Sequence, residues 1–339
     1  MRRVIMMLAA LAFASAQSPP NLRTIHRGEA KEFTALAAGS IFGPTRCDAS
    51  GAVYFRAYRR GSLFSVPVSR VSQRDDKVLE FDLSKVPEDA VPRADSLTFT
   101  DFAPAGGTLY IPAVNEEENR SFVLRFSAGD GRWLGTTALQ PGFDAFKIAA
   151  FNSGAFVASG AMLQEDAPGK TKGFTHYAAL YDPTGRWVKQ LGSLQLGTDG
   201  TKSEPVGQEH MPDTTMNLME SSGTLVYFLQ PGPPTVIYTF QESGATDIIR
   251  DLWTPGADYV PTNMRVTDSL LWIEYVKDPA KEGKPTKYVV YDLFTKQPVS
   301  MDEKADDLHG AFACYDGSAT YLFLANHNGH RYLLSGVAR

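Results

Sequence analysis

Six polar or charged side chains recur along the chain, each a few residues ahead of a tight-turn signal. In chain order they are Arg46 (preceded by Thr45), Asp101, Lys147, Asn217, Asn263 and His309. The set combines one carboxylate, two amides and three potentially cationic groups. Convergent hydrogen-bonding groups at a concave opening are typical of a binding site, and the alternative is that these side chains only solvate a water-filled channel. Ca²⁺ requires six or more oxygen ligands with several carboxylates, so this set suits a small polar or anionic ligand better than a metal ion.

The segments that follow these positions predict strands, because six Gly-, Ser- or Asp-containing turns each precede a run rich in Val, Tyr, Phe and Leu. The turn signals lie at residues 48–51, 105–107, 152–154, 221–223, 267–269 and 315–317. The positions between the polar residues and the turns become apolar. A second hairpin follows the first five copies, as in residues 178–191, where Asp182-Pro183-Thr184-Gly185 has the residues of a type I turn. The sixth copy has one further strand, and residues 33–38 form an unpaired apolar segment ahead of the first copy.

Turn signals repeat every ~46–69 residues, and helical periodicity is nearly absent. We therefore predict an all-β, six-bladed β-propeller of four-stranded antiparallel blades, with the last blade closed by an N-terminal strand. A β-sandwich would not explain the six matched turns. The chain resembles the secreted six-bladed propellers of the NHL- and TolB-like group, through residues 181–188 (YDPTGRWV) and the turn-then-apolar starts. The resemblance covers roughly residues 32–339 and implies the fold without specifying an activity.

The N-terminus has the features of a secretory signal peptide: Arg2 and Arg3, an apolar run to Phe13, and an Ala-Ser-Ala site ending at Ala16. We predict a signal peptide over 1–16, a linker over 17–31 and one propeller domain over 32–339. The protein is then expected in the periplasm or outside the cell. The apolar run is too short for a membrane span, which needs ~20 residues. Without Arg2 and Arg3 the net charge goes from −5 to −7, and no basic cluster suggests nucleic-acid binding.

Cys47 and Cys314 are the only cysteines. They fall at similar places in the expected inner strands of the first and last blades, which are neighbours in a closed ring. In an oxidising compartment they can form a disulfide, provided that their Cα atoms lie within ~7 Å. Two buried free thiols are the alternative. Neither cysteine has a neighbouring histidine in the sequence, so we do not expect a zinc site.

The expected strand order places the six polar positions on one face of the disc, together with the long polar insertions at residues 160–175, 195–215 and 277–286. Loops on a rigid scaffold commonly carry binding residues, although long surface insertions are also tolerated without a role. We expect the functional surface on this loop-rich face.

Two functions remain open from the sequence. The first is a non-enzymatic module that binds a protein partner or a small polar or anionic ligand, with no cofactor. The second is a hydrolase or lyase, similar to the propeller lactonases, with a site around Asp101, Lys147 and His309. The sequence contains no GxSxG, P-loop, GxGxxG or HExxH motif.

Overall fold

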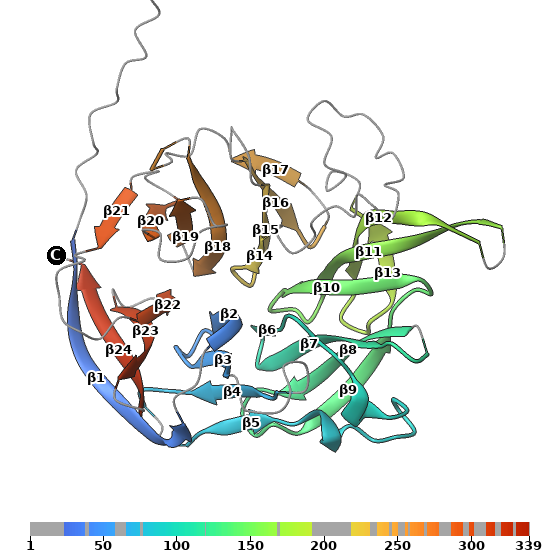
Figure 1. The fold of residues 1–339 in the computed structure, drawn as a ribbon, viewed down its shortest axis with the longest axis horizontal. Helices are drawn as coiled ribbons and strands as arrows, with labels where there is room; N and C mark the ends of the chain where they lie inside the picture. The colour runs from blue at the N-terminus through green and yellow to red at the C-terminus, as the bar shows by residue number, and fades with distance from the viewer. Residues whose placement is uncertain are drawn as a thin grey trace, which may run out of the picture.

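The computed structural model of the chain describes residues 24–37, 41–57, 66–74, 77–118, 120–167, 170–191, 218–230, 236–243, 246–249, 255–256, 258–267, 270–277, 286–293, 298–301, 310–315, 320–327 and 330–338. Over these residues the strands form six blades, numbered 1 to 6 in chain order. Figure 1 shows the blades around a central axis, with the first strand of each blade nearest to it. The predicted six-bladed, all-β architecture is confirmed, and the two stacked layers of a β-sandwich are excluded.

The strands of each blade follow one another in the chain and pair antiparallel. Blades 1 to 3 are β2 (Ile41–Cys47), β3 (Val53–Ala57), β4 (Val68–Val71) and β5 (Leu79–Phe81); β6 (Ala103–Ala105), β7 (Thr108–Asn115), β8 (Arg120–Ser127) and β9 (Trp133–Ala138); and β10 (Phe143–Ala150), β11 (Phe156–Ala167), β12 (Lys170–Tyr181) and β13 (Trp187–Gln190). Blades 4 to 6 are β14 (Leu218–Ser221), β15 (Leu225–Gln230), β16 (Val236–Gln241) and β17 (Thr246–Ile249); β18 (Tyr259–Thr267), β19 (Leu270–Lys277), β20 (Thr286–Asp292) and β21 (Pro298–Met301); and β22 (Gly310–Tyr315), β23 (Thr320–His327) and β24 (His330–Ala338).

The strand β1 (Thr24–Ala37) runs along β24 at the outer side of blade 6. The two pair antiparallel from Ile25 opposite Ala338 to Ala37 opposite His330. Within the predicted segment 33–38, Phe33 is buried, and residue 38 lies outside the described residues. The strand begins at Thr24, so the second half of the predicted linker 17–31 is strand in the structure. At Thr24 and Ile25 the strand also pairs parallel with β21 of blade 5. Residues 24–31 contain few apolar side chains, so they lack the apolar alternation by which a sequence predicts a strand.

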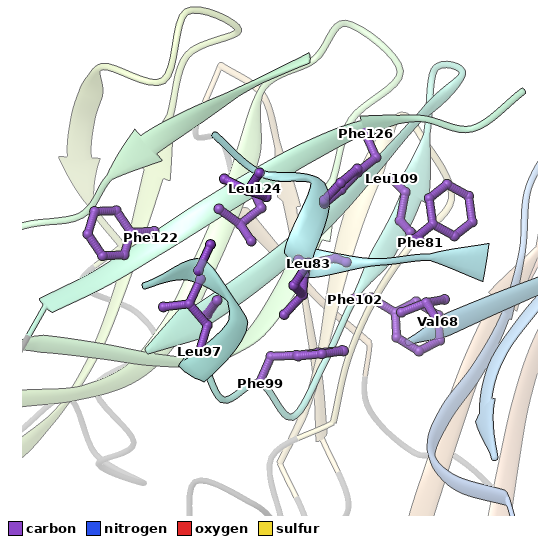
Figure 2. Close-up of a cluster of buried hydrophobic side chains, with 14 of the residues drawn as sticks. Val68, Phe81, Leu83, Leu97, Phe99, Phe102, Leu109, Phe122, Leu124 and Phe126 are labelled. Atoms are coloured by element: carbon purple, nitrogen blue, oxygen red, sulfur yellow. The ribbon is translucent and has the colours of Figure 1, made fainter. Parts of the chain in front are cut away.

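Apolar side chains fill the interfaces between neighbouring blades. Between blades 1 and 2, Phe81 packs edge-on against Phe126, with ring centroids 6.2 Å apart. Figure 2 shows this cluster, to which the connection between β5 and β6 contributes Leu83 of the 3₁₀ helix η1 (Leu83–Lys85) and Leu97, which directly follows the 3₁₀ helix η2 (Ala94–Ser96). Each such buried side chain contributes about 1.5–3 kcal/mol relative to its exposed form.

The first and last blades also share a core, which contains Val53 and Phe55 of blade 1 with Leu322 and Leu324 of blade 6. Further apolar contacts join blades 2 and 3, 3 and 4, 4 and 5, and 5 and 6, so the blades are packed against one another around the ring. Within the part of the chain that the structure describes, no helix has the length and hydropathy of a membrane span.

The turn at Asp182–Gly185 has the predicted hairpin geometry. The amide of Gly185 donates to the carbonyl of Asp182 at 2.8 Å, and Gly185 has a φ of 86°. The pairing of β12 with β13 shifts register directly beside this turn. A type I turn followed by a left-handed glycine and a bulge is a common hairpin connection.

The prediction of a polar loop insertion at residues 160–175 is wrong. β11 and β12 continue through it as a paired ribbon from Gly160 opposite Tyr177 to Ala167 opposite Lys170. β10 supports β11 only as far as Met162, so the outer part of the ribbon has two strands and no sheet to cover. Its sequence therefore lacks the apolar alternation that marks the other strands. The insertions predicted at 195–215 and 277–286 lie mainly outside the described residues.

Candidate functional site

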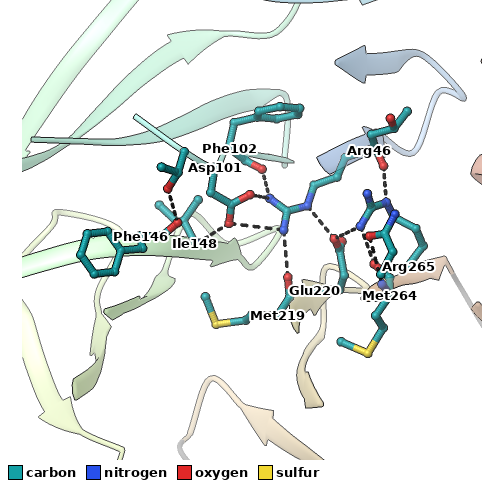
Figure 3. Close-up of polar contacts among 12 residues, drawn as sticks. Arg46, Asp101, Phe102, Phe146, Ile148, Met219, Glu220, Met264 and Arg265 are labelled. Atoms are coloured by element: carbon teal, nitrogen blue, oxygen red, sulfur yellow. Dashed lines mark hydrogen bonds and ion pairs between the residues drawn. The ribbon is translucent and has the colours of Figure 1, made fainter. Parts of the chain in front are cut away.

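Four buried charged residues from four blades meet on the central axis. They are Arg46 at the end of β2, Asp101 just before β6, Glu220 on β14 and Arg265 on β18, and each is at most 5% exposed. Figure 3 shows Arg46 between Asp101 and Glu220, with Arg265 on the other side of Glu220. We call these four residues the central network. Two positive and two negative groups make it close to neutral when all are ionised.

Arg46 holds the network together because its guanidinium is surrounded by acceptors. Its Nη1 lies 2.8 Å from Asp101 Oδ1, its Nε lies 2.8 Å from Glu220 Oε1, and its Nη2 donates to the Met219 carbonyl at 2.8 Å. A further bond reaches the carbonyl of Phe102. Burial alone would lower the pKa of Arg46, but the adjacent Asp101 and Glu220 raise it above its usual range. Arg46 therefore stays charged and joins blade 1 to blades 2 and 4.

Arg265 shares the Glu220 carboxylate from the opposite side. Its Nη1 lies 2.9 Å from Glu220 Oε1, and its Nε and Nη1 also donate to the carbonyls of Thr45 and Met264. Its Nη2 is buried and has no hydrogen-bond partner among the residues that the structure describes. Burial lowers the pKa of Arg265 because Glu220 only partly compensates the lost solvation.

Blade 3 joins the network through its backbone. The amide of Ile148 on β10 donates to Asp101 Oδ2 at 2.8 Å. Asp101 is fully buried. Its Oδ1 accepts from Arg46 and its Oδ2 accepts from Ile148, so both carboxylate oxygens are hydrogen-bonded. A general base must accept a proton from a reacting group within hydrogen-bond reach, and Asp101 is 0% exposed, so a substrate in the channel does not reach its carboxylate.

Irregular strand pairing places the predicted side chains around the axis. The registers of β2, β10 and β18 each shift directly before one predicted residue, namely Arg46, Lys147 and Asn263. At β10 the neighbouring strand carries Gly160, where a Cβ would come within 1.8 Å of the Asp144 carbonyl oxygen. Bulges redirect side chains and are common beside functional sites.

Among the described residues, the central channel is narrow between its two mouths. A cavity of about 330 Å³ opens on the side where the inner strands begin, and one of about 560 Å³ opens on the side of the turns that follow them. Between them lies a void of only about 20 Å³, bordered by Arg46, Glu220 and Arg265. Such a void holds about one water molecule. The central network thus forms the floor of the first cavity, which we call the strand-start pocket.

The strand-start pocket contains charged groups that lack ion-pair partners. Lys147 and Glu274 both line it and are half-buried. No oppositely charged group lies within 4.0 Å of either one among the described residues. Glu274 Oε2 accepts only a long contact of 3.5 Å from Asn263 Nδ2. Burial raises the pKa of Glu274, and Asn263 and Arg265 offset this only in part.

The cavity on the turn side differs, because its charged groups satisfy one another. Tyr54 donates from its hydroxyl to Asp48 Oδ2 at 2.8 Å, and Arg70 Nε donates to the Tyr54 hydroxyl at 3.2 Å. Arg70 Nε also lies 3.7 Å from Asp48 Oδ2. Despite its larger volume, this cavity offers fewer unmatched charges to a ligand.

The structure brings four of the six predicted residues together, since Arg46, Asp101, Lys147 and Asn263 all line the strand-start pocket. Asn217 and His309 lie outside the described residues. Arg46 and Asp101 bind each other, so they do not present free groups to a ligand as the sequence suggested.

Sequence reasoning missed Glu220, Arg265 and Glu274. It expected the inner strands to become apolar after their first polar residue, and that expectation was wrong for β14 and β18. The alternation of side chains along a strand provided a signal, because Arg265 follows Asn263 by two positions and shares its face.

Cys47 borders the narrow part of the channel and is disulfide-bonded. The side chain of Cys314 lies outside the described part of the structure, so the pairing of these two cysteines stays a prediction. No group of three or more His, Cys, Asp or Glu side chains suited to a metal ion occurs among the described residues.

The raised pKa of Glu274 predicts a pH-dependent stability. The folded state holds the Glu274 proton more tightly than the unfolded chain, where the ordinary pKa is 4.5. The stabilisation from this proton is complete below pH 4.5 and is lost as the pH rises through the folded-state pKa. Relative to Glu274→Gln, the wild type should therefore lose stability as the pH rises from 4.5 through the folded-state pKa of Glu274. Urea unfolding midpoints of both proteins over a pH series measure the effect, and parallel curves would contradict it.

No protein-family model matches the sequence, and no curated protein matches it. Similar solved structures include the β-propeller domain of the Trilobed protease from Pyrococcus furiosus, with 10% identity, coverage of 90% of this chain and 85% of that one, and a TM-score of 0.45. YCF48 from Cyanidioschyzon merolae has 10% identity, coverage of 90% and 98%, and a TM-score of 0.42. The GH74 xyloglucanase from Xanthomonas campestris has 12% identity, coverage of 91% and 45%, and a TM-score of 0.47. These similarities do not indicate an activity. The chain is a six-bladed β-propeller because its own strands form a ring of six blades.

Proposed function

We propose that the chain is a non-enzymatic binding module that holds a small polar ligand in the strand-start pocket. The observation that carries this proposal is an open pocket with a floor of paired charges and with two charged groups, Lys147 and Glu274, that form no ion pair with any of the described residues. The volume of about 330 Å³ is at the lower end of the range for small-molecule sites. A fixed floor of paired charges is preorganised, which reduces the cost of ordering the site on binding.

The contacts of Asp101 favour binding over hydrolysis. A lactonase-like site would use this carboxylate, but Asp101 is 0% exposed and bonded through both oxygens. Breaking the contacts of a buried ion pair costs about 3–5 kcal/mol, which would add to the barrier of a reaction that used Asp101 as a base.

Thermal unfolding in the presence of separate small polar compounds, comprising carboxylates, amino acids and sugars, tests the proposal. A compound that binds the native state raises its melting temperature. The effect should weaken in Lys147→Met, which removes the charge from the pocket. The matched control is Lys85→Met, because Lys85 is exposed on η1 away from the pocket. Unchanged melting temperatures with all of these compounds would contradict the proposal.

We also propose that the protein is exported and that its folded part is of the NHL- or TolB-like kind. The basic N-terminus, the short apolar run and the Ala-Ser-Ala site support export. Mass spectrometry of the protein from its native host should find a chain that begins at Gln17, in the periplasmic or extracellular fraction. A chain that retains Arg2 and Arg3 in the cytoplasmic fraction would contradict export.

A further inference from the structure

We propose that the ligand of the strand-start pocket is a zwitterion of the α-amino acid type, with its carboxylate toward Lys147 and Arg265 and its ammonium group toward Glu274. This inference rests on the proposed function and specifies the chemical class of the ligand. Figure 3 shows the neutral floor on which the ligand would lie.

The side of the pocket that suits a carboxylate is defined by two donors. The ammonium group of Lys147 on β10 has no carboxylate within 4.0 Å among the described residues. Arg265 is 96% buried, since its exposed fraction is 4%, and its Nη2 is the one buried donor lining the pocket, within the described part of the chain, that lacks a hydrogen-bond partner. An unsatisfied buried donor costs ~1–3 kcal/mol. Because Arg265 lines the same pocket as Lys147, a ligand carboxylate at Lys147 would also be attracted by the positive charge of Arg265.

The side that suits a cation is the Glu274 carboxylate on β19. Asn263 lies opposite Glu274 in the pairing of β18 with β19 and directs its Nδ2 toward Glu274 Oε2 at 3.5 Å. The hydroxyl of Thr262 donates to the Glu274 backbone carbonyl at 3.4 Å. The first contact places a neutral amide beside the carboxylate without neutralising it, and the second involves only the Glu274 backbone. An ammonium group would supply the missing charge and would donate hydrogen bonds of the charge-assisted kind.

Other ligand classes match only part of this arrangement. Lys147 belongs to blade 3 and Glu274 to blade 5, and blade 4 lies between them in the ring. A simple anion would satisfy Lys147 but would place a negative charge in the same pocket as Glu274. A neutral sugar would leave both charges without a partner. Discrimination against such ligands follows from the unpaired charges that they would bury.

Isothermal titration with L-alanine, N-acetyl-L-alanine and L-alaninamide tests the two charge requirements separately. The acetyl derivative lacks the cation and the amide lacks the anion, while the remaining atoms are nearly the same. We expect L-alanine to bind and each derivative to bind at least about tenfold more weakly, as for the loss of one hydrogen bond to a charged group. If L-alanine gives no heat, the other proteinogenic amino acids are titrated in the same way, each with its two derivatives.

Variants assign each requirement to a residue. Glu274→Gln should weaken the free amino acid about tenfold and should leave the N-acetyl derivative unchanged. Lys147→Met should also weaken the free amino acid about tenfold, and it should leave binding of the amide derivative unchanged. Glu88→Gln and Lys85→Met are the matched controls, because both side chains are exposed on the connection between β5 and β6.

The outcomes separate this inference from the proposed function. If acetate or succinate binds as tightly as the amino acids, or if the derivatives bind as tightly as their parents, the zwitterion is wrong and a polar-ligand pocket remains. If carboxylates, amino acids and sugars all fail to bind, both proposals are wrong. Binding of an amino acid that is the same in Glu274→Gln and Lys147→Met places the ligand elsewhere and overturns the inference.

Discussion

Replacement of Glu220 by alanine is expected to lower the free energy of unfolding by about 3–5 kcal/mol. Glu220 Oε1 accepts from Arg46 at 2.8 Å and from Arg265 at 2.9 Å, and both guanidinium groups are almost fully buried. Without this carboxylate, two cations remain in the centre of the ring, and Asp101 is then their one ion-pair partner among the described residues. The cost comes from this uncompensated charge, which greatly exceeds the worth of an exposed ion pair.

Guanidinium unfolding of the wild type, Glu220→Ala and Glu242→Ala measures the effect. Glu242 is exposed in the turn after β16, so its replacement should change the free energy of unfolding by less than about 0.5 kcal/mol. A loss for Glu220→Ala as small as that of the control would contradict a structural role for the central network.

Simultaneous replacement of all four network residues distinguishes the loss of a counter-charge from the loss of packing. The variant Arg46→Met, Asp101→Leu, Glu220→Leu and Arg265→Met buries apolar groups in place of the charges. Buried charge networks replaced in this way often keep or gain stability. We expect the fourfold variant to be more stable than Glu220→Ala, although it removes more hydrogen bonds. A fourfold variant that is less stable than the single one would show that the hydrogen bonds themselves hold the blades.

The sequence sufficed for the blades because each is a local unit. Turn signals such as Asn152–Gly154 and apolar runs such as 225–230 lie within one hairpin, and neighbouring hairpins repeat the pattern. β1 was only partly predicted because its early residues are polar. The ribbon from Gly160 to Lys170 was also missed, because it lacks apolar alternation. Beyond Met162 its two strands pair with each other and no longer with β10.

The sequence predicted only those site residues whose position follows from the start of an inner strand. Arg46, Lys147 and Asn263 were found because each begins the regular part of an inner strand. Which charges neutralise one another was beyond the sequence, since Arg46 and Glu220 are 174 positions apart. Glu274 belongs to a second strand and reaches the pocket only through its pairing with Asn263, a neighbour relation that depends on the register shift in β18.

Loss of the disulfide of Cys47 is expected to destabilise the protein by about 5–6 kcal/mol in the chain-entropy model. We propose Cys314 as its partner, because the chain has no other cysteine. Ala313, the neighbour of Cys314 on β22, borders the same small void as Cys47, so the two strands meet there. A bridge between these strands closes a loop of nearly the whole chain, and long loops lose the most unfolded-state entropy.

Two measurements on the wild type and on Cys47→Ala/Cys314→Ala test this bridge. Alkylation of the denatured wild type should label neither cysteine until a reductant is added. The free energy of unfolding of the reduced wild type should fall to that of the double variant, and the double variant should not respond to reductant. Labelling of both thiols without reductant would contradict the pairing. A reduced wild type as stable as the oxidised one would show instead that the packing of Val53 and Phe55 against Leu322 and Leu324 holds the first and last blades together without the covalent link.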